Sequence, residues 1–485
     1  MKLLKRLIKK EPSATPEPKQ RRIHDSMVRA FSLTSSIEGE TSFSTSVVPI
    51  SQIINRTQRK LVAQSRDAYM RNNNMHKFVR LCKNNVIGEK GVQLQMNIKN
   101  EKLERDELAI EAIETHFAEW CRKQNCDISQ RKSLSQIQKL AIGCAATDGE
   151  YLIRLLNGHG KYGLQLQILD PQLIPVNYHG DLKGGSYIRH GIEFNEYNAI
   201  VAYYFKKSCQ NYENDYTRIP ANEIIFDFLP EFPMQKRGFP WGYTALSDLE
   251  KLHDLDNTVL DKMDNAASMT GFAKIAGKSS YGDADIIELE RDAITLLGHD
   301  DDLQLFNIQY PSGEAKQFNK TKLQGIGSGM GVPYHSLTGD LEGANYSSLR
   351  SGELDSRELW KELQEWFING FMHTVFEAWL KNALLKGIIK DASGKVLSPV
   401  KFDYYNKPLF QGRRWSWVDP SKDIKAAEVA LKNNLISHST LMRERGYDPE
   451  TIFKEIASDK KKMQELGITN EDVLNYNPEP QEEDE

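Results

Sequence analysis

The spacing of apolar positions in the N-terminal half of the chain changes from a helical to a strand period. Apolar side chains at 52–85 fall on helical faces, and the asparagines at 72–74 predict a break between two helices. Further helices are predicted at about 105–124 and 133–146. From 150 to 228 apolar and polar residues alternate in short runs separated by Gly-containing turns, which is typical of strands. This order predicts an α+β domain.

Longer apolar stripes follow in the C-terminal half. Leucines and other apolar residues at three- and four-residue spacing after residue 243 predict a rod of about 38 Å. The stripe at 346–385 predicts a helix of about 60 Å, far longer than the usual three turns. Gly352 and Gly370 each weaken that helix by about 1 kcal/mol relative to alanine and mark where it would kink. Residues 420–467 are predicted to form polar helices, so the pattern favours an elongated molecule.

Composition and charge separate the two ends of the chain from the rest. Residues 1–45 are rich in Pro, Ser, Thr and charge and are expected to be a flexible arm, and the chain ends in the acidic stretch PEPQEEDE. The formal charge of −4 hides eight Lys or Arg against two Glu in residues 1–22. Residues 52–88 likewise contain eight Lys or Arg against one Asp. This asymmetry is compatible with nucleic acid or another charged partner, although a solvated basic face is the commoner cause.

The sequence contains no pattern typical of a membrane span or secretory signal, and no cysteine motif typical of a disulfide frame or zinc site. It contains no run of eighteen apolar residues and no secretory signal pattern, which predicts a protein that stays in a cytoplasm and does not bind a membrane. Its five cysteines show neither a C-x-x-C motif nor zinc spacing and are expected to be reduced thiols. They are Cys82, Cys121, Cys126, Cys144 and Cys209.

Candidate chemistry is sparse. The glycines of GIGSGMG at 325–331 lack the Lys-Ser/Thr of a phosphate loop, so close backbone approach between helices is the better interpretation. The acidic loop at 299–302 has the oxygen ligands of a hard cation, but such loops are more often solvated turns. Asp148 and Glu150 flank a glycine in a turn before a strand, which weakens them as a catalytic pair. Without a G-x-S-x-G, an H-E-x-x-H or a complete G-x-x-x-x-G-K-[ST] motif, we expect neither an enzyme nor a cofactor.

Several segments in a fixed order carry a family resemblance. They include SRDAYMRNNNMHKFVRLCKNNVIGEKGVQLQ, RIPANEIIFDFLPEFPMQKRGFPWGYTAL, GVPYHSLTGDLEGANYSSLRSG and WVDPSKDIKAAEVAL. Between about residues 50 and 467 the chain resembles the portal proteins of lambda-like tailed bacteriophages and their prophages. The pattern GVPY…LTGD…NYSS.R is its most specific part.

The resemblance implies a structural protein of the virion, assembled in the host bacterial cytoplasm, with no cofactor and no metal. It implies a homo-oligomeric ring, usually of twelve subunits, at one capsid vertex. Its expected partners are double-stranded DNA in the channel, the terminase large subunit, head completion and connector proteins, and the scaffold and major capsid proteins. Two alternatives stay open: a metal-dependent nuclease using Asp300 to Asp302, and a head or tail structural protein that forms no channel.

The resemblance also implies the α+β portal fold, with wing, stem, clip and crown regions, elongated helices and small mixed sheets. The implied regions are a flexible basic N-terminal arm at 1–45, an α/β wing at 46–235, a stem helix at 236–271, a clip at 272–320, a second stem element at 321–336, a tunnel loop at 337–346, a long tunnel or wing helix at 347–386, wing return strands at 387–419, a helical crown at 420–467 and an acidic tail at 468–485.

Two groups of residues are the candidate functional positions. The first would line the DNA channel, where Asp340 and Glu342 would repel phosphate and leave DNA free to slide. The second would pack against other helices or subunits, because exposed aromatics at that density would form a sticky patch. The channel group is Thr338, Gly339, Asp340, Glu342, Gly343 and Asn345, and the packing group is Trp366, Phe367, Phe371 and Trp379.

Overall fold

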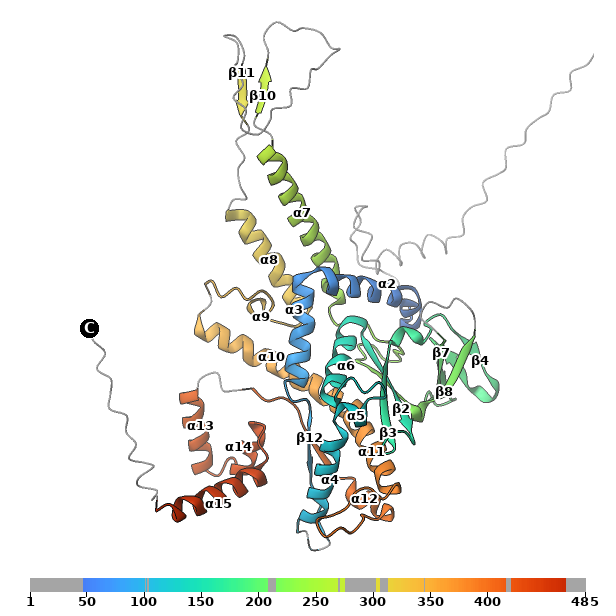
Figure 1. Ribbon diagram of the computed structural model, residues 1–485. Helices are drawn as coiled ribbons and strands as arrows, with labels where there is room; N and C mark the ends of the chain where they lie inside the picture. The colour runs from blue at the N-terminus through green and yellow to red at the C-terminus, as the bar shows by residue number, and fades with distance from the viewer. Residues whose placement is uncertain are drawn as a thin grey trace, which may run out of the picture.

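The computed structural model describes residues 47–467 except 101, 103, 208–214, 269–270, 275–301, 306–312, 344 and 416–419. The expected flexible arm, the acidic tail and most of the expected clip therefore lie outside the described residues. An α/β body carries a projecting helix pair at one end and a group of short helices at one side (Figure 1). None of the described helices has the length and hydropathy needed to cross a membrane. The cysteines within the described residues are free thiols.

The chain enters the body through two helices separated at the predicted position. Helix α2 spans Ile50–Arg71 and α3 spans Asn73–Cys82. They are separate because Asn72 has an extended backbone and its side chain accepts the amide hydrogens of the first turn of α3. A π-turn, η1 (Lys83–Ile87), continues α3 to Gly88, and strand β1 (Gln93–Met96) follows.

The central layer is a three-stranded sheet covered by helices. Helices α4 (Glu107–Trp120), α5 (Lys123–Cys126) and α6 (Leu134–Asp148) precede β2 (Glu150–Asn157), and α6 begins with a capping box of Ser133 and Gln136. The strand order is β3-β2-β9, with β3 at Leu164–Leu169 and β9 at Ile224–Phe228. Strand β2 is almost wholly buried because α6 and helix α11 (His373–Leu385) both pack near it.

A second, five-stranded sheet forms the outer part of the body. Its order is β4-β5-β6-β7-β8, so each strand pairs with its neighbour in sequence. Every ladder in the described part of the chain is antiparallel, where small mixed sheets were expected, because short turns join most neighbouring strands. The strands are β4 (Gly180–Asp181), β5 (Tyr187–Arg189), β6 (Ile192–Phe194), β7 (Ile200–Lys206) and β8 (Tyr216–Pro220).

The projecting pair consists of α7 (Leu246–Ser268) and α8 (Gly313–Gly329), which lie side by side (Figure 1). Two short paired strands, β10 (Gly271–Lys274) and β11 (Asp302–Leu305), lie beyond their tip. Helix α8 begins at Gly313, eight residues before the start expected for the second stem element. The glycine run at 325–331 ends this helix. A Cβ at Gly329 would lie 3.1 Å from Thr244 Oγ1, so this glycine lies close to the turn that precedes α7.

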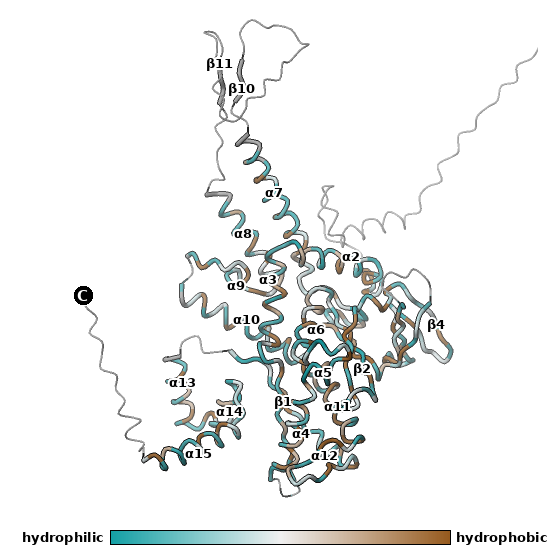
Figure 2. The backbone as a smooth tube through the Cα atoms, viewed as in Figure 1, coloured by the Kyte–Doolittle hydropathy of each residue, from teal (hydrophilic) through white to brown (hydrophobic). Residues whose placement is uncertain are grey.

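The longest feature is one continuous helix in three parts: α10 (Tyr346–Phe367), the π-turn η6 (Ile368–Met372) and α11 (His373–Leu385). The stripe at 346–385 therefore predicted its length correctly, and the irregularity falls at Gly370 and not at Gly352. Figure 2 shows apolar positions concentrated where the body helices meet the sheets, and mixed positions along α7 and α15.

After α11 the chain returns to the body and then forms three polar helices. Helix α12 (Phe402–Tyr405) precedes β12 (Pro408–Gln411), which pairs with β1, so only one strand of this return forms a named ladder in the described part. The polar helices are α13 (Pro420–Lys432), α14 (His438–Glu444) and α15 (Pro449–Glu465). They are held to the body by Gln411 Nε2, which donates to Arg443 O at 2.7 Å, and by the ion pair Lys454–Glu107 at 3.4 Å.

Candidate functional site: the loop between α9 and α10

The loop between the short helix α9 (Tyr334–Thr338) and α10 is set by its local sequence. Gly339 ends α9 with a φ of +82°, a conformation that glycine adopts without strain. Asn345 then starts α10, because its side-chain oxygen accepts the backbone amide of Ser348 at 2.7 Å. Thr338 and Asn345 therefore lie at the two ends of the loop, and Gly343, with a φ of +73°, turns the chain between them. The six candidate channel residues lie together on this one connection.

The carboxylates of this loop are paired with lysines of α8. Glu342 Oε2 lies 2.7 Å from Lys316 Nζ, and Asp340 Oδ2 lies 3.9 Å from Lys320 Nζ. Lys320 Nζ also donates to the backbone oxygen of Glu342 at 3.3 Å. The loop is therefore joined to the projecting helix pair by opposite charges, and salt weakens such exposed contacts.

A tyrosine orients one of these carboxylates. Tyr334 Oη donates to Asp340 Oδ2 at 2.7 Å, and this hydrogen bond is the main reason that the pKa of Asp340 lies below its ordinary value. The contact with Glu342 raises the pKa of Lys316 above its ordinary value. Both groups are therefore charged near neutral pH, and the surface combines two anions with two cations. The sequence pattern missed the cations because Lys316 and Lys320 lie some twenty residues away on another helix.

The candidate packing residues lie on the long helix behind this loop. Phe367, Phe371 and Trp379 are fully buried, while Trp366 is partly buried. Phe367 and Phe371 stack with ring centroids 4.9 Å apart, and Trp379 meets Phe117 edge to face at 4.9 Å. Trp366 contacts Tyr151 and Trp241 at 5.6 and 5.9 Å. In a single chain these four side chains contact the body of their own subunit.

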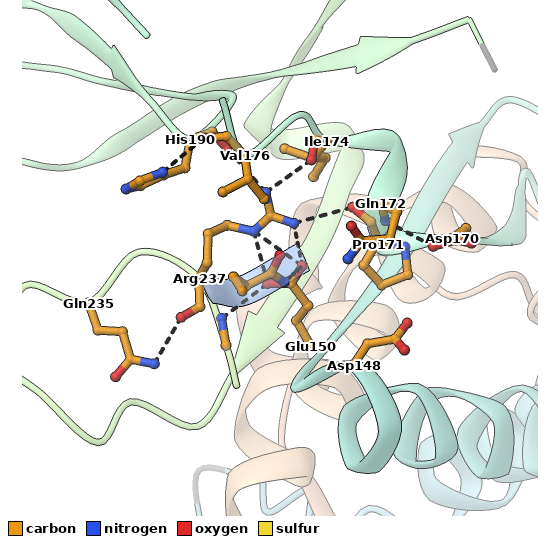
Figure 3. A network of polar contacts seen from close by, with 12 residues as sticks. Asp148, Glu150, Asp170, Pro171, Gln172, Ile174, Val176, His190, Gln235 and Arg237 are labelled. Atoms are coloured by element: carbon orange, nitrogen blue, oxygen red, sulfur yellow. Dashed lines mark hydrogen bonds and ion pairs between the residues drawn. The ribbon is translucent and has the colours of Figure 1, made fainter. Parts of the chain in front are cut away.

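Asp148 and Glu150 were weighed above as a catalytic pair, but Glu150 forms a fully buried ion pair with Arg237, and Asp148 lies near it (Figure 3). Glu150 and Arg237 are both fully buried, and Arg237 Nε lies 2.9 Å from Glu150 Oε2. Arg237 Nη1 also donates to the backbone oxygens of Ile174 and His190, at 3.0 and 3.3 Å. Burial raises the pKa of Glu150, and the charge of Arg237 opposes that shift.

Asp148 forms an ion pair with a different arginine, Arg66. Arg66 Nε and Nη2 donate to the two oxygens of Asp148 at 2.8 and 2.6 Å, and the same guanidinium reaches Asp170. Each carboxylate is thus engaged by a guanidinium, so Asp148 joins the end of α6 to α2 and Glu150 joins β2 to the segment after β9. Arg66 and Arg237 are far away in sequence, and no local motif indicated them.

The acidic loop at 299–302, considered above as a cation site, lies mostly outside the described residues. His299, Asp300 and Asp301 lie outside the described residues, and Asp302 is the first residue of β11. Within the described residues no group of three His, Cys, Asp or Glu side chains is placed to hold a metal ion.

Comparison with known proteins assigns the chain to a family. Residues 40–364 match the model of the family described as phage portal protein, lambda family. The chain is 30% identical over 436 residues to the probable portal protein of Halomonas phage phiHAP-1, covering 86% of this chain and 83% of that protein. It is 19% identical over 411 residues to portal protein B of Escherichia phage lambda, covering 73% of this chain and 74% of that protein.

The chain also has distant similarity to a solved structure. A protein in the neck of an empty gene transfer agent particle shares 13% identity, with a TM-score of 0.45 over 81% of this chain and 94% of its own. The extent of the family match, together with the 30% identical relative, settles the assignment. The chain belongs to the lambda family of phage portal proteins, which are structural components of the virion at the capsid vertex and not enzymes.

Proposed function

We propose that this protein forms a closed ring of about twelve copies around a channel for double-stranded DNA, which enters during packaging and leaves during ejection. The observation that carries the proposal is the family match at 40–364, which includes the projecting helix pair and the loop beside it. The ring would dock the terminase large subunit and the head completion proteins, and would meet the scaffold and major capsid proteins in the procapsid.

The architecture supports an assignment of regions. The α/β body at 46–235 is proposed as the wing, and α7 and α8, which project from it in Figure 1, as the stem. The segment between α7 and α8, which contains β10 and β11 beyond the tip of the pair, is proposed as the clip and terminase contact. Helices α13 to α15 are proposed as the crown.

The loop at 337–346 is proposed to line the channel. Its support is its position between the stem helix α8, which it contacts through Lys316–Glu342, and the start of α10. The alternation of anions and cations suits a surface past which DNA slides, because neither sign dominates and counterion release would contribute little to binding.

The stem also offers apolar surface for contact between copies. Leu255 and Leu260 on α7 are 39% and 59% exposed, and Phe318 on α8 is 51% exposed. Large apolar side chains on a projecting helix pair leave water when a neighbouring copy packs against them. A head-to-tail contact of this kind closes into a ring when the rotation between neighbours is right.

Negative-stain microscopy and native mass spectrometry of the purified protein test the proposal. We expect closed rings, and we expect the double variant Leu260→Glu and Phe318→Glu to stay folded by circular dichroism but to lose the ring. A matched variant, Met70→Glu, changes a residue that is 76% exposed on α2 and should keep the ring. Only monomers or dimers of the unmodified protein across a range of salt would refute the ring.

A further inference from the structure

A cavity lies where helix α2 passes the base of the projecting helix α7 (Figure 1). Its volume is about 260 Å³, and it is lined by the C-terminal half of α2 and the N-terminal half of α7. Leu246 and Leu249, which are buried, and Ala68, which is partly buried, give it an apolar floor. Such a floor between two helices suits the apolar side chains of a ligand.

The rim of this cavity is acidic. Three carboxylates line it, those of Asp67, Glu250 and Asp254, and the other ionisable residues there are Arg71 and His253. Arg71 Nε lies 2.9 Å from Asp67 Oδ1, so these two charges offset each other. Glu250 and Asp254 are exposed, and neither takes part in an ion pair within the described part of the chain. The cavity therefore attracts cations.

Helix α7 extends this negative charge beyond the cavity. Its 23 residues include six Asp or Glu and two Lys. One of the six, Asp248, lies 4.0 Å from Lys322 of α8, at the limit of an ion pair. Phosphate is repelled by such a face, so nucleic acid does not fit it. A partner that does fit combines positive charge for the rim with apolar side chains for the floor.

The beginning of the same chain has both properties. Its first ten residues, MKLLKRLIKK, contain five Lys or Arg and no Asp or Glu. Leu4, Leu7 and Ile8 recur at the three- and four-residue spacing that predicts one apolar side. A basic segment with an apolar side matches a groove that has an apolar floor and acidic walls, which is a common mode of peptide recognition.

The N-terminal arm is long enough to bring this segment to the cavity. The described chain begins at Val47, just before α2, and the cavity lies near the other end of that helix. The helical rise from Ile50 to Asp67 is about 26 Å. Residues 11–46 span up to about 120 Å when extended, so residues 1–10 can reach the cavity of their own subunit or of a neighbouring copy.

We propose that residues 1–10 dock in this cavity, with their apolar side against Leu246 and Leu249 and their lysines beside Glu250 and Asp254. The docked segment holds the N-terminal arm against the base of the projecting helix pair. Docking within one subunit does not depend on the proposed ring, whereas docking in a neighbour rests on it. Two other pairings are outcomes of the test: the basic segment against the acidic residues 468–485, and the basic segment against the phosphates of nucleic acid.

Zero-length crosslinking of the full chain tests the docking. A carbodiimide activates a carboxylate, a lysine amine attacks it to form an amide, and the reagent leaves as a urea. Peptide mapping by mass spectrometry should show a lysine of residues 1–10 joined to Glu250 or Asp254. Mixing isotopically labelled and unlabelled subunits before assembly tells contacts within a subunit from contacts between neighbours. Crosslinks within a subunit would support the docking even if the protein formed no ring.

A cation placed in the cavity gives the specific prediction and leaves every reactive group in place. Gln64 lines the cavity, so Gln64→Arg should repel the basic segment and lower the yield of these crosslinks at least about fivefold. Gln52→Arg makes the same change at an exposed position of α2 outside the lining and should leave the yield unchanged. About 0.5 M salt should also lower the yield, because it screens exposed charges.

The apolar side of the segment has a separate test. Leu4→Ser with Leu7→Ser keeps all the lysines and should lower the yield at least about fivefold, because the apolar contact with the floor is lost. Ala14→Ser with Thr15→Ser changes two arm residues outside 1–10 and should leave the yield unchanged. These variants do not alter the body, so they keep the test available if Gln64→Arg does not fold.

The competing pairings give different results. Crosslinks that join residues 1–10 only to the acidic residues 468–485, or only to Glu11 and Glu17 beside them, would overturn the proposal. An unchanged yield in both the cavity variant and the leucine variant would do the same. The proposal would equally fail if no crosslink reached Glu250 or Asp254 while deletion of residues 2–10 lowered the affinity of the protein for a short DNA duplex.

Discussion

The charged residues buried in this body are paired with residues from distant segments of the chain. The free-energy cost of burying each charge stays low only while its partner is present. Arg237 and Glu150 have no exposed side-chain surface, so either one alone would be an uncompensated buried charge. Arg237→Met should therefore lower the free energy of unfolding by about 3–5 kcal/mol, measured by urea denaturation. Adding Glu150→Gln should recover part of the loss.

An exposed pair provides the control for this variant. Arg71 and Asp67 lie 2.9 Å apart on α2 with side chains 75% and 52% exposed. Arg71→Met should cost less than about 1 kcal/mol. Equal losses for Arg237→Met and Arg71→Met would contradict the role given to burial.

Asp227 should make stability depend on pH in a defined direction. Burial raises its pKa from 3.8 to about 6, although the amide of Phe228 donates to it. The folded state then binds the proton more tightly than the unfolded state, so this contribution to stability is present at low pH and is lost as the pH rises from about 4 to about 6.

Asp227→Asn should remove that dependence. The variant should gain stability relative to the unmodified protein as the pH rises, by at most about 3 kcal/mol at pH 7.5, since one pKa unit corresponds to about 1.4 kcal/mol. Urea unfolding of both proteins between pH 4.5 and 7.5 measures the difference. A constant difference across this range would show that Asp227 is not titrating in the folded protein.

At the scale of elements, the long helix has one local irregularity, the π-turn η6, whose position depends on contact with Asp227 of β9. A Cβ at Gly370 would lie 2.2 Å from Asp227 Oδ2, while one at Gly352 would find its nearest atom at 3.4 Å. Gly370→Ala should therefore cost about 1–3 kcal/mol through forced displacement. Gly352→Ala should be neutral or stabilise by up to about 1 kcal/mol. Thermal unfolding of the two variants tests the contrast, and equal effects would be evidence against it.

The sequence predicted elements well where the signal was local. The stripe at 346–385, the break near Asn72 and the alternating strands after residue 150 all depend on neighbours within a few positions, and the structure contains them. The π-turn at Gly370 was not predictable, because its tight contact with Asp227 arises only after β9 and the long helix pack together.

The sequence indicated the loop that carries the candidate site but not the lysines that face it. Gly, Asp and Asn at 337–346 are typical of a loop, and in the structure Gly339 ends α9 and Asn345 starts α10. The lysines that face Asp340 and Glu342 lie on α8. Their contacts depend on how two helices pack, which residue spacing along one chain does not specify.

At the scale of the whole molecule, the charge of the loop is repeated in every copy of the proposed ring. Replacing Asp340 and Glu342 with lysine adds positive charge beside Lys316 and Lys320, and about twelve copies would surround the channel with it. Phosphates then displace counterions and DNA is held more tightly at low salt. We expect rings to form normally while DNA translocation slows in a packaging assay, most strongly at low ionic strength.

The reverse change separates two causes of such slowing. Lys316→Glu with Lys320→Glu breaks the same ion pairs between the loop and α8 but makes the surface more negative. If positive charge retains DNA, only the lysine variant slows translocation, and added salt restores its rate. If release of the loop from α8 is responsible, both variants slow and salt restores neither. Normal packaging by the lysine variant combined with failed ring assembly would instead show that the loop is a contact between subunits and not part of the channel wall.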